Sequence, residues 1–111
     1  MILLRKQADQ QYIAERAVTE HFRVPAEALL SKKRDRNYVI VRTFVWYFLS
    51  TRYGWSSPVV GECYGRDHST ILHAVEKVKA DPRLRDELMY LVPRVEELET
   101  LFLGKNALAK P

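Results

Sequence analysis

Residues 57–79, SPVVGECYGRDHSTILHAVEKVK, decide the fold. Ser56 and Pro58 place a serine cap and a proline at the start of the stretch, which is typical of the beginning of a helix. Gly65 is a typical helix end, and Asp67, two residues later, is a good N-cap for a second helix. The stretch therefore predicts two helices joined by a tight turn, over 57–64 and 67–79.

The second of these helices has an apolar face and a polar face. Its apolar residues recur at helical spacing: Ile71, Ala74, Val75 and Val78. Its start carries five polar residues in a row, 66–70. Two helices joined by a glycine-containing turn form a helix-turn-helix, in which the second helix enters the DNA major groove with its N-terminal residues at the bases. The sequence thus predicts one face packed on a core and a helix start offered to nucleic acid.

Each of the five polar side chains suits the base edges of the major groove. Arg66 can bind guanine through two hydrogen bonds, and Asp67 can accept one from cytosine. His68, Ser69 and Thr70 can bond bases or phosphates, and a threonine methyl can contact thymine. A purely structural interpretation is also open, in which Asp67 only caps the helix and the histidines are solvated.

The rest of the chain predicts further helices. Apolar residues recur at near-helical spacing over 5–22, and Pro25 favours a short helix after it. The segment 38–54 is open between a strand, favoured by its β-branched and aromatic residues, and a buried helix, favoured by its length. Asp81 starts a long C-terminal helix that Pro93 should kink or split. We expect an all-α chain, one domain over 1–111, with a loose tail over 104–111.

The C-terminal helix carries a seam of apolar residues at spacings of four and three: Leu84, Leu88, Leu91, Val95, Leu98 and Phe102. Such a stripe is more often core, and here it would dock on the helix over 5–22. The alternative is a homodimer or a helical protein partner bound through the residues from Leu84 to Leu98. A protein-interaction module using the seam over 84–102 is therefore one of the functions left open.

Composition limits the function classes. The 111 residues carry a net charge of +4 and a pI near 9.3, a mild basic excess that is compatible with nucleic acid. Cys63 is the single cysteine, so a disulfide framework and a zinc pair of cysteines are excluded. His68 and His73 lie five apart, which is the wrong spacing for a zinc pair on one helix face. We expect no enzyme, no cofactor, no metal and no membrane span, and a protein of the bacterial cytoplasm associated with the nucleoid.

A resemblance adds to this interpretation. YGRDHSTILHAVEKV, residues 64–78, resembles the signature of the C-terminal DNA-binding domain of the bacterial chromosomal replication initiator DnaA, where the pattern runs Gly-Gly-Arg-Asp-His-Ser/Thr-Thr-Val-Leu-His-Ala. ALLSKKRDRNYVIVRTFVWYFL, residues 28–49, is similar to the family's Leu-Ser-Lys-Arg-Arg segment, basic loop and long helix. SSPVVG, residues 56–61, stands where the family has Ser-Leu-x-x-Ile-Gly. The resemblance covers about residues 10–100.

The resemblance implies an all-helical domain that binds short double-stranded DNA boxes at replication origins. It implies major-groove contacts from Arg66, Asp67, His68, Ser69 and Thr70, and an arginine of the basic loop, Arg34, in the adjacent minor groove. Backbone contacts are implied for Lys32, Lys33, Arg36, Arg42 and His73. For Arg42, a structural role near the core is an open alternative.

The chain departs from the family pattern in two places. The family has two glycines before the arginine, whereas here only Gly65 precedes Arg66, so we expect a shorter turn that re-aims the recognition helix. Val41-Arg42-Thr43 replaces the family's Ala-Arg-Gln, which puts one backbone contact in doubt.

The sequence also lacks the Gly-x-x-x-x-Gly-Lys-Ser/Thr motif of the initiator's nucleotide-binding module, so we expect no nucleotide partner and no ATPase. The expectation is a stand-alone DNA-binding regulator or competitor of initiation, encoded by a phage or another mobile element. The alternative is a transcriptional regulator that recognises its own operator.

Overall fold

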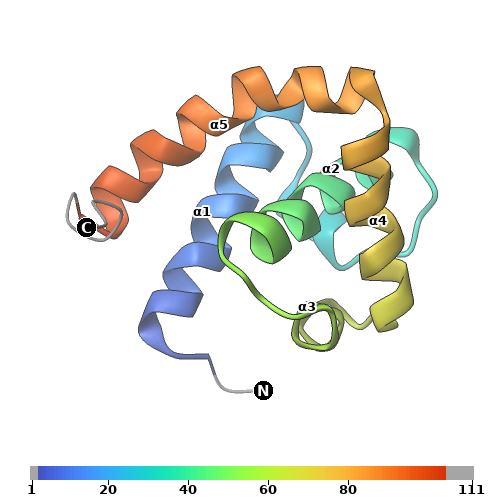
Figure 1. The fold of residues 1–111 in the computed structure, drawn as a ribbon, viewed down its shortest axis with the longest axis horizontal. Coiled ribbons are helices and arrows are strands. Elements are labelled where there is room, and N and C mark those ends of the chain that lie inside the picture. The colour runs from blue at the N-terminus through green and yellow to red at the C-terminus, as the bar shows by residue number, and fades with distance from the viewer. Residues whose placement is uncertain (1–2, 105–111) are drawn as a thin grey trace.

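The computed structural model describes residues 3–104, and these residues form helices and connecting loops without a strand (Figure 1). The elements, in chain order, are α1 (Arg5–Phe22), the 3-10 helix η1 (Ala26–Leu29), α2 (Arg36–Tyr47), the π-helix η2 (Phe48–Arg52), α3 (Ser57–Tyr64), α4 (His68–Ala80) and α5 (Pro82–Phe102). The all-α prediction is confirmed, and both helices of the helix-turn-helix begin and end within one residue of their predicted bounds. The predicted tail, 104–111, lies outside the described residues except for Gly104.

Two of the three predicted helix starts have the expected cap bond, whereas Asp67 is the N-cap residue of α4 without a capping hydrogen bond from its side chain. The Ser56 hydroxyl accepts the backbone N–H of Val59 at 3.4 Å at the start of α3. The Asp81 carboxylate accepts the backbone N–H of Arg83 at 2.9 Å at the start of α5. Both helices have proline in the first turn, where its missing N–H costs no hydrogen bond. The local sequence therefore sets these two boundaries.

The ambiguous segment 38–54 is helical. The Asp35 carboxylate caps α2 by accepting the Asn37 N–H at 2.9 Å. α2 packs mainly on α4 and also on α1, so half of its residues, from Val41 to Trp46, are buried. A helix covered on several sides can be apolar nearly all round, which explains a composition that also fitted a strand. The apolar residues of this segment therefore reflect the burial of a helix, not a strand.

The leucine seam of α5 is part of the core. Leu91, Val95 and Leu98 are at most 2% exposed, and Leu84 and Leu88 are half-buried against the same core. α5 packs mainly on α1, as Figure 1 also shows. The chain itself covers the middle of this seam, whereas Phe102 at its end is 46% exposed. Pairing of a homodimer or a partner helix through the seam stays a prediction.

Pro93 does not split α5, since one helix runs from Pro82 to Phe102. Figure 1 shows this helix changing direction along its length, as the kink alternative predicted. Within residues 3–104, none of the helices combines the length and the apolar character that a bilayer crossing requires.

Candidate nucleic-acid interface

The turn between α3 and α4 depends on two glycines with different roles. Gly65 ends α3 in the left-handed conformation, at φ 65° and ψ 39°, which glycine adopts without strain. Gly61, one turn earlier, provides space, because a Cβ there would lie 2.4 Å from the backbone oxygen of Arg66. The Arg66 N–H donates to the Gly61 oxygen at 2.8 Å. The turn is thus pressed closely against α3.

Tyr64 stands where the family pattern has its first glycine. It is the last residue of α3, and residues 65–67 connect it to α4. Its ring is buried, and its hydroxyl donates to Glu15 at 2.5 Å and accepts from Gln11 at 3.1 Å. The hydrogen bond between Tyr64 and Glu15 ties α3 to α1. Burial is the main cause that raises the pKa of the Glu15 carboxyl. The position needs no positive φ, so a tyrosine fits there.

The first turn of α4 places four of the five predicted base-reading residues at the surface. Asp67 is the N-cap residue, and its carboxylate accepts the Ser69 hydroxyl; this bond is the main cause that lowers the pKa of Asp67. Asp67 and His68 are exposed, and Ser69 and Thr70 are half-exposed. These four side chains form one polar surface at the N-terminus of a helix.

The basic loop lies beside this surface. We use the name basic loop for residues 31–35, which connect η1 to α2. The loop's cations Lys32, Lys33 and Arg34 are exposed, as is Arg36 at the start of α2. Among the described residues, none of these four cations forms an ion pair with an acidic side chain. Their charge is therefore not neutralised by a carboxylate of the described residues.

A groove of about 310 Å³, which we call the cationic groove, separates the basic loop from α4. Its basic lining residues are Lys32, Arg34, Arg42, Arg66, His73 and Lys77. Thr70 and Ala74 also line it, so the α4 side of the groove consists of residues 70, 73, 74 and 77, which share one face of the helix. Among residues 3–104, five Lys and Arg side chains and no acidic residue line the groove.

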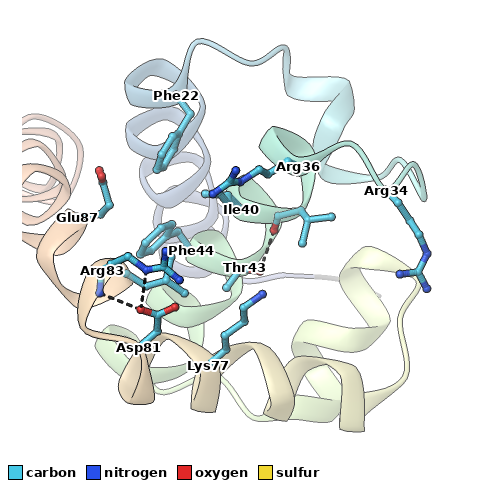
Figure 2. A pocket seen from close by; sticks show the side chains of 12 residues that line it. Phe22, Arg34, Arg36, Ile40, Thr43, Phe44, Lys77, Asp81, Arg83 and Glu87 are labelled. Carbon is cyan, nitrogen blue, oxygen red and sulfur yellow. Dashed lines mark hydrogen bonds and ion pairs between the residues drawn. The ribbon is translucent and has the colours of Figure 1, made fainter.

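Lys77 is the functional candidate that sequence reasoning missed. It lines the cationic groove and also a neighbouring groove of about 500 Å³ between α2, α4 and α5. Figure 2 shows Phe22 and Phe44 in the second groove, with Lys77 pointing into it and Arg34 pointing away. The signal for Lys77 was present in the sequence, because it follows His73 at a spacing of four on the polar face of α4.

Arg42 and Arg66 are placed differently from the other cations. Arg42 is only 4% exposed, and its guanidinium donates to the backbone oxygens of Ser31 at 2.8 Å and Lys33 at 2.9 Å. This placement favours the structural role for Arg42 over a phosphate contact. Arg66 is half-buried and turns back toward the basic loop, where it donates to the Ser31 oxygen at 2.8 Å. Its guanidinium is therefore bound to the basic loop.

Among residues 3–104, no group of three or more His, Cys, Asp or Glu side chains is arranged to hold a metal ion. Asp67 and His68 do approach each other, with Nδ1 and Oδ1 3.7 Å apart, but both side chains are more than half exposed. The surface is thus best described by its polar first turn, its basic loop and the cationic groove between them.

The family described as bacterial dnaA protein helix-turn-helix matches residues 12–78. The chain belongs to this family. The match includes α2, α3, the basic loop and nearly all of α4, so it covers the whole candidate interface.

The proteins that are similar to this chain include chromosomal replication initiator proteins named DnaA. The chain is 40% identical over 74 residues to the chromosomal replication initiator protein DnaA of Acinetobacter baumannii, which covers 66% of this chain and 15% of that protein. It is 40% identical over 67 residues to DnaA of Acinetobacter baylyi, 60% of this chain and 14% of that protein. DnaA of Deinococcus deserti is 36% identical over 63 residues, 57% of this chain and 14% of that protein.

The chain thus matches about one seventh of the length of these DnaA relatives. No solved structure gives a significant match. Family membership therefore rests on the sequence comparison, and the arrangement of the site rests on the structure described above.

Proposed function

We propose that the chain binds double-stranded DNA, with the first turn of α4 in the major groove and the basic loop in the adjacent minor groove. The observation that carries this proposal is the cationic groove. Adjacent grooves of a duplex are separated by one sugar–phosphate strand, so a protein that reads both holds that strand between its two reading elements. Here the space between the two elements is lined by cations and by no carboxylate, as a phosphate strand requires.

Each residue then has a distinct role. Asp67, His68, Ser69 and Thr70 face base edges, where short donors and acceptors discriminate base pairs. Arg34 enters the minor groove, whose negative potential is strongest where A·T pairs make it narrow. The remaining contacts are to phosphates, from Lys32, Lys33, Arg36, His73 and Lys77. This proposal adds Lys77 to the sequence-based set and assigns Arg42 to the protein interior.

The relatives are named chromosomal replication initiator protein. We therefore propose that the DNA sequence bound by this chain is a short box of the kind that replication initiators bind at origins. The 111 residues contain no phosphate-binding Gly-x-x-x-x-Gly-Lys-Ser/Thr motif. Acting as a separate protein of phage or mobile-element origin, they would occupy such boxes without ATP and compete with a full initiator.

A second target is favoured by one observation. Arg42 stands within the family's Ala-Arg-Gln segment but is buried. A domain that loses one backbone contact can shift its register on DNA, because phosphate contacts fix the register. A transcriptional operator of the chain's own is therefore the second candidate.

Substituting Lys77 tests the proposed path of the phosphate strand. Lys77→Ala should weaken binding to all duplexes alike, and it should reduce the slope of log K against log salt by about 1, because one phosphate contact is lost. The measurement is fluorescence anisotropy of a labelled duplex between about 50 and 200 mM salt.

The matched control for this prediction is Lys79→Ala. Lys79 is also an exposed lysine of α4, but it approaches Glu76 at 4.0 Å and lines neither of the two grooves described above. The control should leave the salt slope unchanged. Equal slopes for wild type, Lys77→Ala and Lys79→Ala would place the phosphate strand elsewhere.

A further inference from the structure

The basic loop and the helix-turn-helix turn are joined by hydrogen bonds across the cationic groove. Arg66 donates from Nη2 to the Ser31 backbone oxygen at 2.8 Å. In the opposite direction, Lys32 donates from Nζ to the Gly65 backbone oxygen at 3.4 Å. The element proposed to enter the minor groove is therefore attached directly to the turn that precedes the recognition helix.

Arg42 holds the same loop from inside the protein. Its Nη1 donates to the backbone oxygens of Ala28 at 3.3 Å and Ser31 at 2.8 Å, and its Nη2 donates to Lys33 at 2.9 Å. The Ser31 oxygen thus accepts from both arginines, Arg42 and Arg66. We call the set of Arg42, Arg66 and these loop carbonyls the loop clamp.

The loop clamp is costly in the absence of a ligand. Burial lowers the pKa of Arg42, and the nearby charge of Arg66 lowers it further. No acidic side chain among the described residues pairs with either guanidinium, so the two charges are balanced by carbonyl dipoles and not by a carboxylate. Arg66 also lies over the ring of buried Trp46, 5.5 Å from its centroid, and its Nε has no hydrogen-bond partner. A phosphate strand in the groove would offset this charge.

We propose that Arg42 and Arg66 are positioning residues, which fix the basic loop relative to α4 so that Arg34 reaches the minor groove only at a set distance from the major-groove contacts. This inference rests on the proposed DNA binding. It adds an explanation of what fixes the distance between the minor-groove contact and the major-groove contacts. It differs from a base contact by Arg66, because Arg66 then acts through the loop rather than on a base. The loop clamp makes recognition of the flank depend on an intact turn.

A double-mutant cycle between Arg42 and Arg34 tests this coupling. The variants Arg34→Ala, Arg42→Met and their combination are measured on the best-bound duplex and on one whose minor-groove flank is changed from A·T to G·C. In the wild-type background Arg34→Ala should lower affinity roughly tenfold and abolish the flank preference. In the Arg42→Met background the same change should cost less than about twofold, because the loop no longer places Arg34 in the groove.

Two further variants separate positioning from stability and from base contact. Leu98→Ala removes a buried side chain of α5 far from the loop, so it should lower stability yet keep the tenfold effect of Arg34→Ala. Arg66→Met should fold, since Gly65 sets the turn, and should reduce the Arg34 effect as Arg42→Met does. A base contact by Arg66 would instead change preference at one major-groove position and leave the Arg34 effect intact.

The experiment distinguishes a failure of the loop clamp from a failure of the proposed DNA binding. Wild-type protein that binds no duplex would overturn both proposals. Wild-type protein that binds, with additive effects of Arg34→Ala and Arg42→Met on both duplexes, would overturn the loop clamp alone. The loop clamp would be supported if Arg34→Ala no longer lowered affinity in the Arg42→Met and Arg66→Met backgrounds but still did so in the Leu98→Ala background.

Discussion

Glu99→Ala should lower the free energy of unfolding by about 3–5 kcal/mol, because it removes the buried carboxylate that Arg52 and Tyr53 bond and leaves the partly buried arginine only an exposed acidic neighbour. Glu99 is fully buried. Its carboxylate accepts Arg52 Nε and Nη2, both at 2.7 Å, and the Tyr53 hydroxyl at 2.6 Å. These bonds tie η2 to α5, and they raise the pKa of Arg52 above its ordinary value despite burial. Urea denaturation followed by tryptophan fluorescence measures the loss.

The control for this prediction is Glu96→Ala. Glu96 lies one turn earlier on α5 and approaches the same Arg52 at 3.9 Å, but its side chain is 60% exposed. An exposed pair of this kind contributes about 0–1 kcal/mol. A Glu99→Ala variant as stable as Glu96→Ala would show that the buried ion pair does not hold η2 in place.

Gly61→Ala should lower both stability and DNA affinity. In an ordinary helix this change gains up to about 1 kcal/mol, because alanine is the better helix former. Here the added Cβ would meet the Arg66 backbone oxygen at 2.4 Å, so the turn must move. Overpacking of this kind costs about 1–3 kcal/mol, and the moved turn carries α4 away from its position beside the basic loop. Denaturation and duplex titration on the same variant measure both effects.

Ser57→Ala is the matched control, since Ser57 lies in the same helix and Ser56 alone provides the cap. It should leave stability and affinity nearly unchanged. An increase in stability for Gly61→Ala would contradict the close approach of the turn to α3.

The parts of the fold that sequence predicted are those that local chemistry controls. Ser56 and Asp81 cap their helices through side-chain bonds to nearby backbone groups, so their signals are complete within a few residues. Helical spacing alone also placed Leu91, Val95 and Leu98 on one face of α5, and these three residues are buried in the core. The segment 38–54 stayed ambiguous because its burial depends on α1 and α4, which local sequence does not report.

The candidate site was predicted only in part. The polar first turn of α4 and the exposed basic loop followed from residue types at a helix start and in a loop. Arg42 and Glu99 could not be resolved, because the burial of a charged side chain depends on distant partners. Arg42 bonds the carbonyls of a loop 9–14 residues away, and Glu99 bonds Arg52 across 47 residues. Nothing in the neighbouring sequence distinguishes either from a surface charge.

Selection of bound duplexes from a random library at moderate salt tests the DNA-binding claim most directly, with the initiator's box as a spiked control. We expect enrichment of one short motif with an A·T-rich flank, and affinity that falls steeply with salt. Enrichment of the spiked box would identify an initiator-type site, and enrichment of another motif would identify an operator of the chain's own. No enriched motif, together with absent or salt-insensitive binding, would contradict DNA recognition by this chain.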